Sequence, residues 1–198
     1  MLSPGTLTVV TGTGGTGGTG GTALFDLVAG LAPTEGTVRF DGIDVRRLDG
    51  DRLAAGVAVV TRRPFLVPGS IAENVTLGAA CTDAELTEAL RIAALRESAD
   101  PADHRVQVAT ARAVLRRPRL LVLDDATAEL EPDVERQLLQ NLAETTITVL
   151  AATDRPGQFA DQIVRLAADR ITVIGRHDAQ YHQVVHPRTP EPIPATAV

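Results

Sequence analysis

The chain of 198 residues contains no lysine, so all nineteen of its basic residues are arginines. Lysine is the usual point charge of phosphate-binding loops, and a loop without it must rely on backbone N–H donors. Acidic residues outnumber basic ones, and the formal net charge is -6 with a pI near 5.2. A nucleic-acid binder needs a basic surface that neutralises phosphates, so DNA and RNA are excluded as expected partners.

Cysteine, aromatic residues and long apolar runs are also scarce. The single cysteine, Cys81, cannot form an internal disulfide and indicates a reducing compartment. Aromatic residues make up only 3% of the chain, so Val, Leu, Ile and Ala must fill the core, as is typical of a parallel sheet covered by helices. No run approaches the ~20 apolar residues of a membrane span. We therefore expect that any work at a membrane requires docking onto another chain.

Alternating strand and helix patterns predict an α/β fold with a mostly parallel sheet and right-handed crossovers. We expect one domain over residues 1–185 and a disordered proline-rich tail over residues 186–198. The predicted strands are 6–11, 36–42, 56–61, 120–123 and 146–152, with a closing hairpin at 162–166 and 170–174. The predicted helices are 22–31, 70–77, 82–97, 105–116 and 133–144.

A glycine-rich segment, TGTGGTGGTGG at residues 11–21, lies between the first strand and the first helix. Backbone N–H groups in such a loop, together with the helix N-terminus, can cradle phosphates. The alternative is a flexible low-complexity connector, because the segment repeats Gly-Gly-Thr. A second candidate site is the Asp124 and Asp125 pair at the end of the most apolar strand, where the alternative is a simple cap of the next turn or helix.

Five ordered blocks over about residues 4–178 resemble the nucleotide-binding domain of exporter-type ABC transporters. They are PGTLTVVTG, TALFDLVAGLAPTEGTVRFDGIDV, VAVVTRRPFLVPGSIAENVTLG, ARAVLRRPRLLVLDDATAELEPDVE and ADQIVRLAADRITVIGRHD. The resemblance implies a P-loop NTPase-like three-layer fold with a small antiparallel hairpin region. It implies a helical subdomain over about residues 80–117, which is shortened here. It also implies ATP and Mg²⁺ as cofactors.

Against this family the phosphate-binding loop lacks its lysine in either possible register. Aligned on the following helix, the Walker A positions are Gly15, Gly18, Gly20, Gly21 and Thr22, with Gly21 in the lysine place and Thr22 as the magnesium-binding hydroxyl. Aligned on the preceding strand, the motif starts at Gly12 and Gly18 takes the lysine place. We prefer the first register because it keeps the hydroxyl.

Other functional positions of the family are altered too. Arg62 stands where the Q-loop glutamine is expected, and Asp154 replaces the switch histidine. Asp124 keeps the place of the Walker B aspartate as a magnesium ligand, while Asp125 replaces the catalytic glutamate. Residues 100–104 (DPADH) replace the signature sequence, and their two carboxylates would repel a triphosphate. Residues 128–131 correspond to the D-loop.

The resemblance therefore implies an ATP-binding-domain homologue with weak or no ATP hydrolysis, such as the noncatalytic half of an exporter. The alternatives are a slow but genuine ATPase that uses Asp125 as base, and a stand-alone scaffold. The implied partners are a transmembrane domain, docked on residues 64–75, and a second nucleotide-binding domain. The alternative for residues 64–75 is that Phe65, Leu66 and Ile71 belong to the core. With such a partner, we expect a cytoplasmic, peripheral location at the inner face of the cell membrane.

Overall fold

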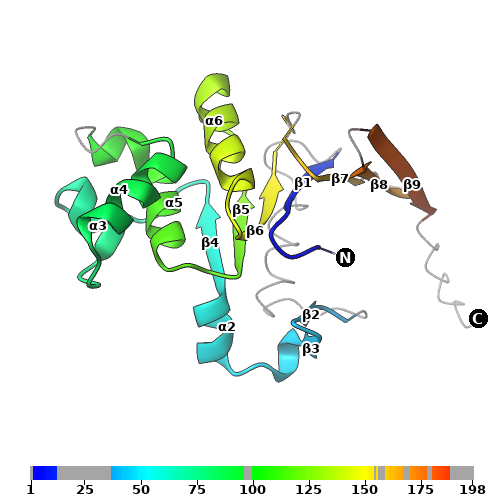
Figure 1. Cartoon of the computed structure of the whole chain (residues 1–198), viewed down its shortest axis with the longest axis horizontal. Helices are drawn as coiled ribbons and strands as arrows, with labels where there is room; N and C mark the ends of the chain where they lie inside the picture. The colour runs from blue at the N-terminus through cyan, green and yellow to red at the C-terminus, as the bar shows by residue number, and fades with distance from the viewer. Residues whose placement is uncertain are drawn as a thin grey trace, which may run out of the picture.

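The structure is a computed structural model that describes residues 2–12, 37–95, 100–153, 155, 159–166, 170–177 and 180–187, the last two segments by their backbone alone. Its seven-stranded sheet has the order β4-β5-β6-β1-β7-β8-β9 (Figure 1). The first five of these strands are parallel, and β8 and β9 join antiparallel. The bounds are β4 Val57–Thr61, β5 Leu120–Asp124, β6 Thr148–Ala152, β1 Leu7–Gly12, β7 Gln162–Leu166, β8 Arg170–His177 and β9 Gln180–Pro187.

The central strands are apolar on both faces, and their alternate residues enter two separate cores. In β5, Leu121 and Leu123 join the larger core, whereas Leu120 and Val122 join the smaller one on the other face. This alternation follows from the two-residue period of a strand. The run LLVL is continuous because both faces of β5 are buried, as is typical of a parallel strand covered on both sides.

Helices α3 to α6 contribute buried residues to the larger core. Helices α3 and α4 each begin with a capping box, Ser70 with Glu73 and Thr82 with Glu85, which satisfies N–H groups that a helix start otherwise leaves unpaired. In Figure 1, α3, α4 and α5 form one group beside the sheet, and α6 stands at the end of β5. The bounds are α2 Gly50–Gly56, α3 Ile71–Thr76, α4 Asp83–Ile92, α5 Arg105–Leu115 and α6 Pro132–Ala143.

Two short hairpin strands and two 3-10 turns complete the described elements. The strands are β2 Arg39–Phe40 and β3 Ile43–Asp44, which pair antiparallel where the sequence predicted an outer hairpin. The turns are η1 Val45–Arg47 and η2 Pro101–His104. The parallel sheet and the antiparallel pair β2–β3 confirm the predicted α/β fold and its small antiparallel region.

Four details differ from the predictions. Helix α2 was not predicted, and α4 ends at Ile92 instead of residue 97, because Ala94 adopts a left-handed conformation with φ of 53°. Strand β9 was also not predicted. The predicted disordered tail is wrong for His186 and Pro187, because both pair with β8, and an edge strand tolerates proline at its end. Residues 188–198 lie outside the described part.

Candidate functional site

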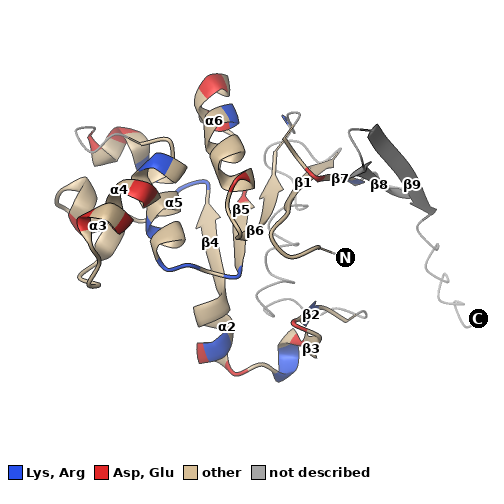
Figure 2. Cartoon of the chain, in the orientation of Figure 1, with Lys and Arg blue, Asp and Glu red and all other residues tan. Residues whose placement is uncertain are grey.

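The loops that follow β4, β5 and β6 meet at one edge of the sheet. These strands are neighbours and parallel, with Thr61 paired with Asp124 and Leu123 paired with Ala151, so their carboxyl ends lie side by side. Open α/β sheets bind their ligands at this edge. Figure 2 shows a basic segment after β4 next to an acidic segment after β5. The candidate site is therefore built from these loops.

Arg62, on the loop after β4, bridges two acids of the loop after β5. Its Nε lies 3.0 Å from Glu129 Oε1, and its Nη1 lies 3.5 Å from Asp125 Oδ2. The three side chains are 37%, 56% and 34% exposed, so the bridge is partly solvated. The structure thus brings together Arg62 and Asp125, the residues predicted for the glutamine and the catalytic carboxylate.

Asp125 occupies a left-handed backbone conformation with φ of 51°. Aspartate tolerates this region better than most residues, and it turns the chain sharply out of β5. Asp125 does not cap a helix, because α6 begins at Pro132 after the N-cap residue Glu131. This excludes the alternative of a helix cap for Asp125. Asp124, the last residue of β5, is half-buried.

A buried carboxylate that the sequence analysis missed lies just behind this edge. Glu135 of α6 is 1% exposed, and its Oε1 accepts hydrogen bonds from Thr127 Oγ1 at 2.5 Å and Thr153 Oγ1 at 2.6 Å. Its Oε2 lies 2.8 Å from Arg155 Nε. A signal existed in the sequence, because Glu135 falls at helical spacing with the buried residues Leu138, Leu139 and Leu142. An acid on the apolar stripe of a helix requires buried partners.

The predicted phosphate loop lies outside the described residues. Gly15, Gly18, Gly20, Gly21 and Thr22 belong to residues 13–36, and the switch position Asp154 is likewise outside. The structure therefore leaves the choice between the two registers as a prediction. It describes Gly12, where β1 ends between β6 and β7. Gly12 therefore lies at the carboxyl edge of the sheet.

The segment in the place of the signature forms η2 and leads directly into α5. Asp100 caps this turn by accepting a hydrogen bond from the Ala102 N–H at 2.8 Å, and His104 Nδ1 lies 2.8 Å from Gln107 Oε1. The carboxylate of Asp100 thus has a local structural role. Asp103 is exposed on the same turn, so acidic charge remains at the start of α5.

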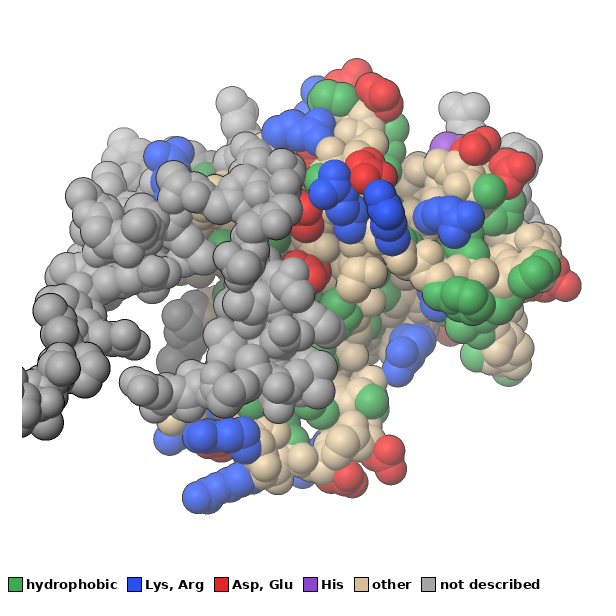
Figure 3. Space-filling model, turned by 180° about the vertical axis from the view of Figure 1, so that it is seen from behind, with side chains coloured by type: hydrophobic (Ala, Val, Ile, Leu, Met, Phe, Trp, Pro, Cys, Tyr) green, Lys and Arg blue, Asp and Glu red, His purple; other side chains and the backbone are tan. Residues whose placement is uncertain are grey.

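Residues 64–75, which we call the docking segment, are partly core and partly surface. Ile71 and Val75 are buried, whereas Phe65 is 75% exposed, and Leu77, just past the segment, is 54% exposed. Arg112 of α5 fixes the segment by donating to the carbonyls of Asn74 at 2.7 Å and Phe65 at 3.0 Å. Burial lowers the pKa of the Arg112 guanidinium below its ordinary value. Figure 3 shows hydrophobic side chains at the surface on the side of the molecule that carries α3.

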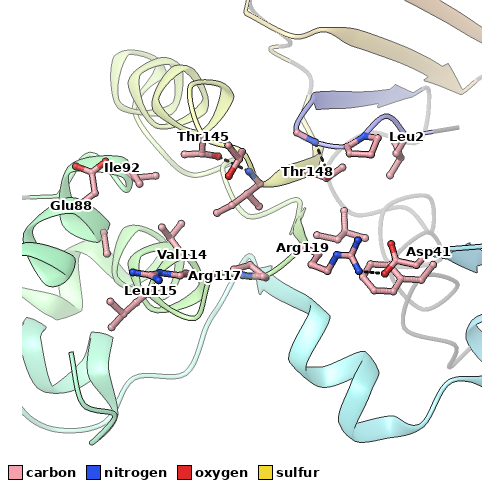
Figure 4. A pocket seen from close by; sticks show the side chains of 18 of the residues that line it. Leu2, Asp41, Glu88, Ile92, Val114, Leu115, Arg117, Arg119, Thr145 and Thr148 are labelled. Atoms are coloured by element: carbon pink, nitrogen blue, oxygen red, sulfur yellow. Dashed lines mark hydrogen bonds and ion pairs between the residues drawn. The ribbon is translucent and has the colours of Figure 1, made fainter. Parts of the chain in front are cut away.

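A large cavity lies at the opposite end of the sheet (Figure 4). Its volume is about 1140 Å³, and residues at the starts of β5 and β6, at the end of α5 and along the length of α4 line it. Its walls include Ile92, Val114 and Leu120, and two rim arginines, Arg117 and Arg119, already pair with Glu85 and Asp41. Ligands of open α/β sheets bind at the other edge, so this cavity is not the candidate site.

Among the described residues, no group of three or more His, Cys, Asp or Glu side chains is arranged to hold a metal ion. None of the helices in the described part is both long and apolar enough to cross a bilayer. At the candidate site, the Arg62 guanidinium lies 3.5 Å from the Asp125 carboxylate.

A family profile described as "ABC transporter" matches residues 1–128 of this chain. The chain belongs to the ABC transporter family. This ABC domain is 34% identical over 200 residues to the mycobactin import ATP-binding/permease protein IrtA of Mycolicibacterium thermoresistibile, covering 89% of this chain and 22% of that protein. It is 30% identical over 185 residues to the heterocyst differentiation ATP-binding protein HepA of Nostoc sp., covering 78% of this chain and 30% of that protein.

A solved structure shares the fold of this chain. The fold of this ABC domain matches a bacterial Atm1-family ABC exporter with ATP bound, with a TM-score of 0.70 at 21% identity, over 83% of this chain and 33% of that one. The resemblance to exporter-type ATP-binding domains predicted from the sequence is thereby confirmed. The chain spans about a fifth to a third of the length of these relatives, which are larger proteins.

Proposed function

We propose that this ABC domain is an impaired nucleotide-binding unit that acts beside a transmembrane partner and supports little or no ATP hydrolysis. The observation that carries the proposal is the bridge from Arg62 to Asp125 and Glu129. In the family, the position of Arg62 holds a neutral glutamine, and the position of Asp125 holds the catalytic glutamate. A guanidinium at this point opposes a second cation and occupies the carboxylate that would activate water.

The magnitude of the expected defect follows from the number of altered groups. Losing one preorganised group that stabilises a transition state typically lowers the rate ~10²- to 10³-fold. The sequence alters the lysine, glutamine, histidine and signature positions together. These effects need not be additive to abolish turnover.

A second candidate function is a slow ATPase that uses Asp125 as base. The exposure of the bridge favours it, because ion pairs between partly exposed groups contribute only about 0 to 1 kcal/mol. A bound nucleotide and metal ion could displace a guanidinium held so weakly. Asp125 would then face the attacking water with a side chain one methylene shorter than glutamate.

The docking segment supports a partner outside this chain. Phe65 exposes three quarters of its surface on a loop that Arg112 and the buried side chain of Asn74 hold in place. Large exposed aromatic groups on a fixed loop are typical of interaction sites. We propose that a transmembrane domain covers this segment, and that the chain is peripheral to the inner face of the membrane. A second nucleotide-binding domain would complete the assembly.

The test is phosphate release from ATP with purified protein, alone and with a membrane partner. The proposal expects no turnover above the rate of a matched Asp125→Asn variant. Magnesium-dependent turnover that disappears in Asp125→Asn would instead establish the slow ATPase. A Phe65→Ala variant should reduce association with the partner, while Ile43→Ala, which alters an exposed residue outside the docking segment, should not.

A further inference from the structure

The buried carboxylate of Glu135 has no part in the proposed function, yet it receives groups from two different loops. Thr127 belongs to the loop after β5, and Thr153 to the loop after β6. Both hydroxyls donate to the same oxygen, Oε1, at 2.5 and 2.6 Å. Thr127 is fully buried and Thr153 is 7% exposed. One acid of α6 therefore connects the two loops through buried hydrogen bonds.

Arg155, on the loop after β6, also connects the two loops. Its Nε lies 2.8 Å from Glu135 Oε2, while its Nη2 donates to the Ala128 carbonyl at 3.2 Å and its Nη1 to the Leu130 carbonyl at 3.4 Å. The guanidinium thus reaches from the loop after β6 to the backbone of the loop after β5. Its planar set of donors suits several acceptors at once, which a lysine could not match.

We infer that Glu135 and Arg155 form a brace that makes residues 126–131 move as one unit with Thr153 and Arg155. Moving either loop alone would separate a buried carboxylate from a hydroxyl or from its cation. An unpaired buried charge is strongly unfavourable, so the loops are displaced together or not at all. Glu135 and Arg155 are positioning residues in this arrangement.

The brace has a functional consequence that does not depend on the loss of turnover. The loop after β5 also carries Glu129, which pairs with Arg62 on the loop after β4. If a partner shifts residues 126–131, Arg155 would transmit that displacement to the loop after β6. In a domain with little catalysis, such a connection still lets a partner bound at one loop alter the other.

The test is native-state hydrogen exchange with one reporter amide in each loop. The Leu130 N–H donates to the Thr127 carbonyl at 3.0 Å, and the Arg155 N–H donates to Thr153 Oγ1 at 3.1 Å. Each variant is read at the reporter in the other loop. Thr153→Val should accelerate exchange at Leu130, and Thr127→Val should accelerate it at Arg155. We expect roughly tenfold, equivalent to about 1.4 kcal/mol.

Arg155→Gln and a surface control complete the design. Arg155→Gln should accelerate exchange at Leu130 more than Arg155→Lys, which retains the charge but not the planar donors. Arg136→Gln removes an exposed ion pair with Asp133 on α6, the helix that carries Glu135. It should leave the exchange rates of both reporter amides unchanged. Unchanged exchange at the remote reporter would overturn the brace. An equal acceleration at β5 amides such as Val122 would also overturn it, because that result indicates global destabilisation.

Discussion

Replacing Arg112 with methionine should loosen the docking segment. The substitution removes two charge-assisted hydrogen bonds, to the Asn74 carbonyl at 2.7 Å and to the Phe65 carbonyl at 3.0 Å. Methionine retains most of the apolar stem, so the loss is mainly polar. Hydrogen bonds from charged donors contribute about 1.5 to 3 kcal/mol each. The two bonds together therefore set an upper range of roughly 3 to 6 kcal/mol.

Burial of the guanidinium offsets part of this loss. Desolvation lowers the pKa of Arg112, and its Nη2 is buried without a hydrogen-bond partner among the described residues. We therefore expect a net loss of about 1 to 3 kcal/mol in the free energy of unfolding. For a chain of this size, a loss of 2 kcal/mol lowers Tm by roughly 4 to 8 °C.

Thermal and urea unfolding measure the global loss, and hydrogen exchange at the Val67 amide measures the local one. That amide donates to Asn74 Oδ1 at 2.9 Å inside the docking segment. The matched control is Arg117→Met, which removes an exposed pair with Glu85 and should change stability by less than about 0.5 kcal/mol. If Arg112→Met is as stable as the wild type, with unchanged exchange at Val67, then Arg112 does not hold the segment.

Two further perturbations test the phosphate loop and the helix caps. Gly21→Lys should tighten ATP binding roughly ten- to a hundredfold in an equilibrium titration without creating an efficient ATPase, and the same gain in Gly18→Lys alone would reverse the register. Hydrogen bonds from Ser70 lower the pKa of Glu73, and those from Thr82 lower the pKa of Glu85, below the ordinary value of 4.5. A lowered pKa stabilises the fold fully above pH 4.5, and this contribution is lost as pH falls through the lowered value. Glu85→Gln should therefore flatten the acid side of the stability curve measured by circular dichroism, and an unchanged curve would contradict the capping box.

The sequence predicted the elements that have a clear period or a clear boundary. The β-branched run of β1, the continuous apolar run of β5 and the stop of α5 before Pro118 place these elements close to their positions in the structure. No strong glycine or proline turn signal precedes strand β9 in the sequence. Its pairing with β8 depends on a partner strand that local patterns do not identify. Helix α2 is short, so its propensity signal is weak.

The site was predictable by position but not by contact. Family resemblance placed Arg62 and Asp125 at related positions, yet their 3.5 Å approach follows from the order β4-β5 in the sheet. The brace required three segments to converge: the loops after β5 and β6 and the first turn of α6. In the sequence, the only sign of the brace was Glu135, an acidic residue on the otherwise apolar stripe of α6.

Equilibrium binding of ATP with and without Mg²⁺, measured by calorimetry, tests the central claim most directly. A loop without lysine, beside a carboxylate held by Arg62, should bind ATP with a Kd of about 1 mM or weaker, near -4 kcal/mol. Magnesium should change this value little, because the guanidinium competes for the same acid. A magnesium-dependent Kd in the low micromolar range, about -8 kcal/mol, would contradict the claim and show that backbone donors suffice.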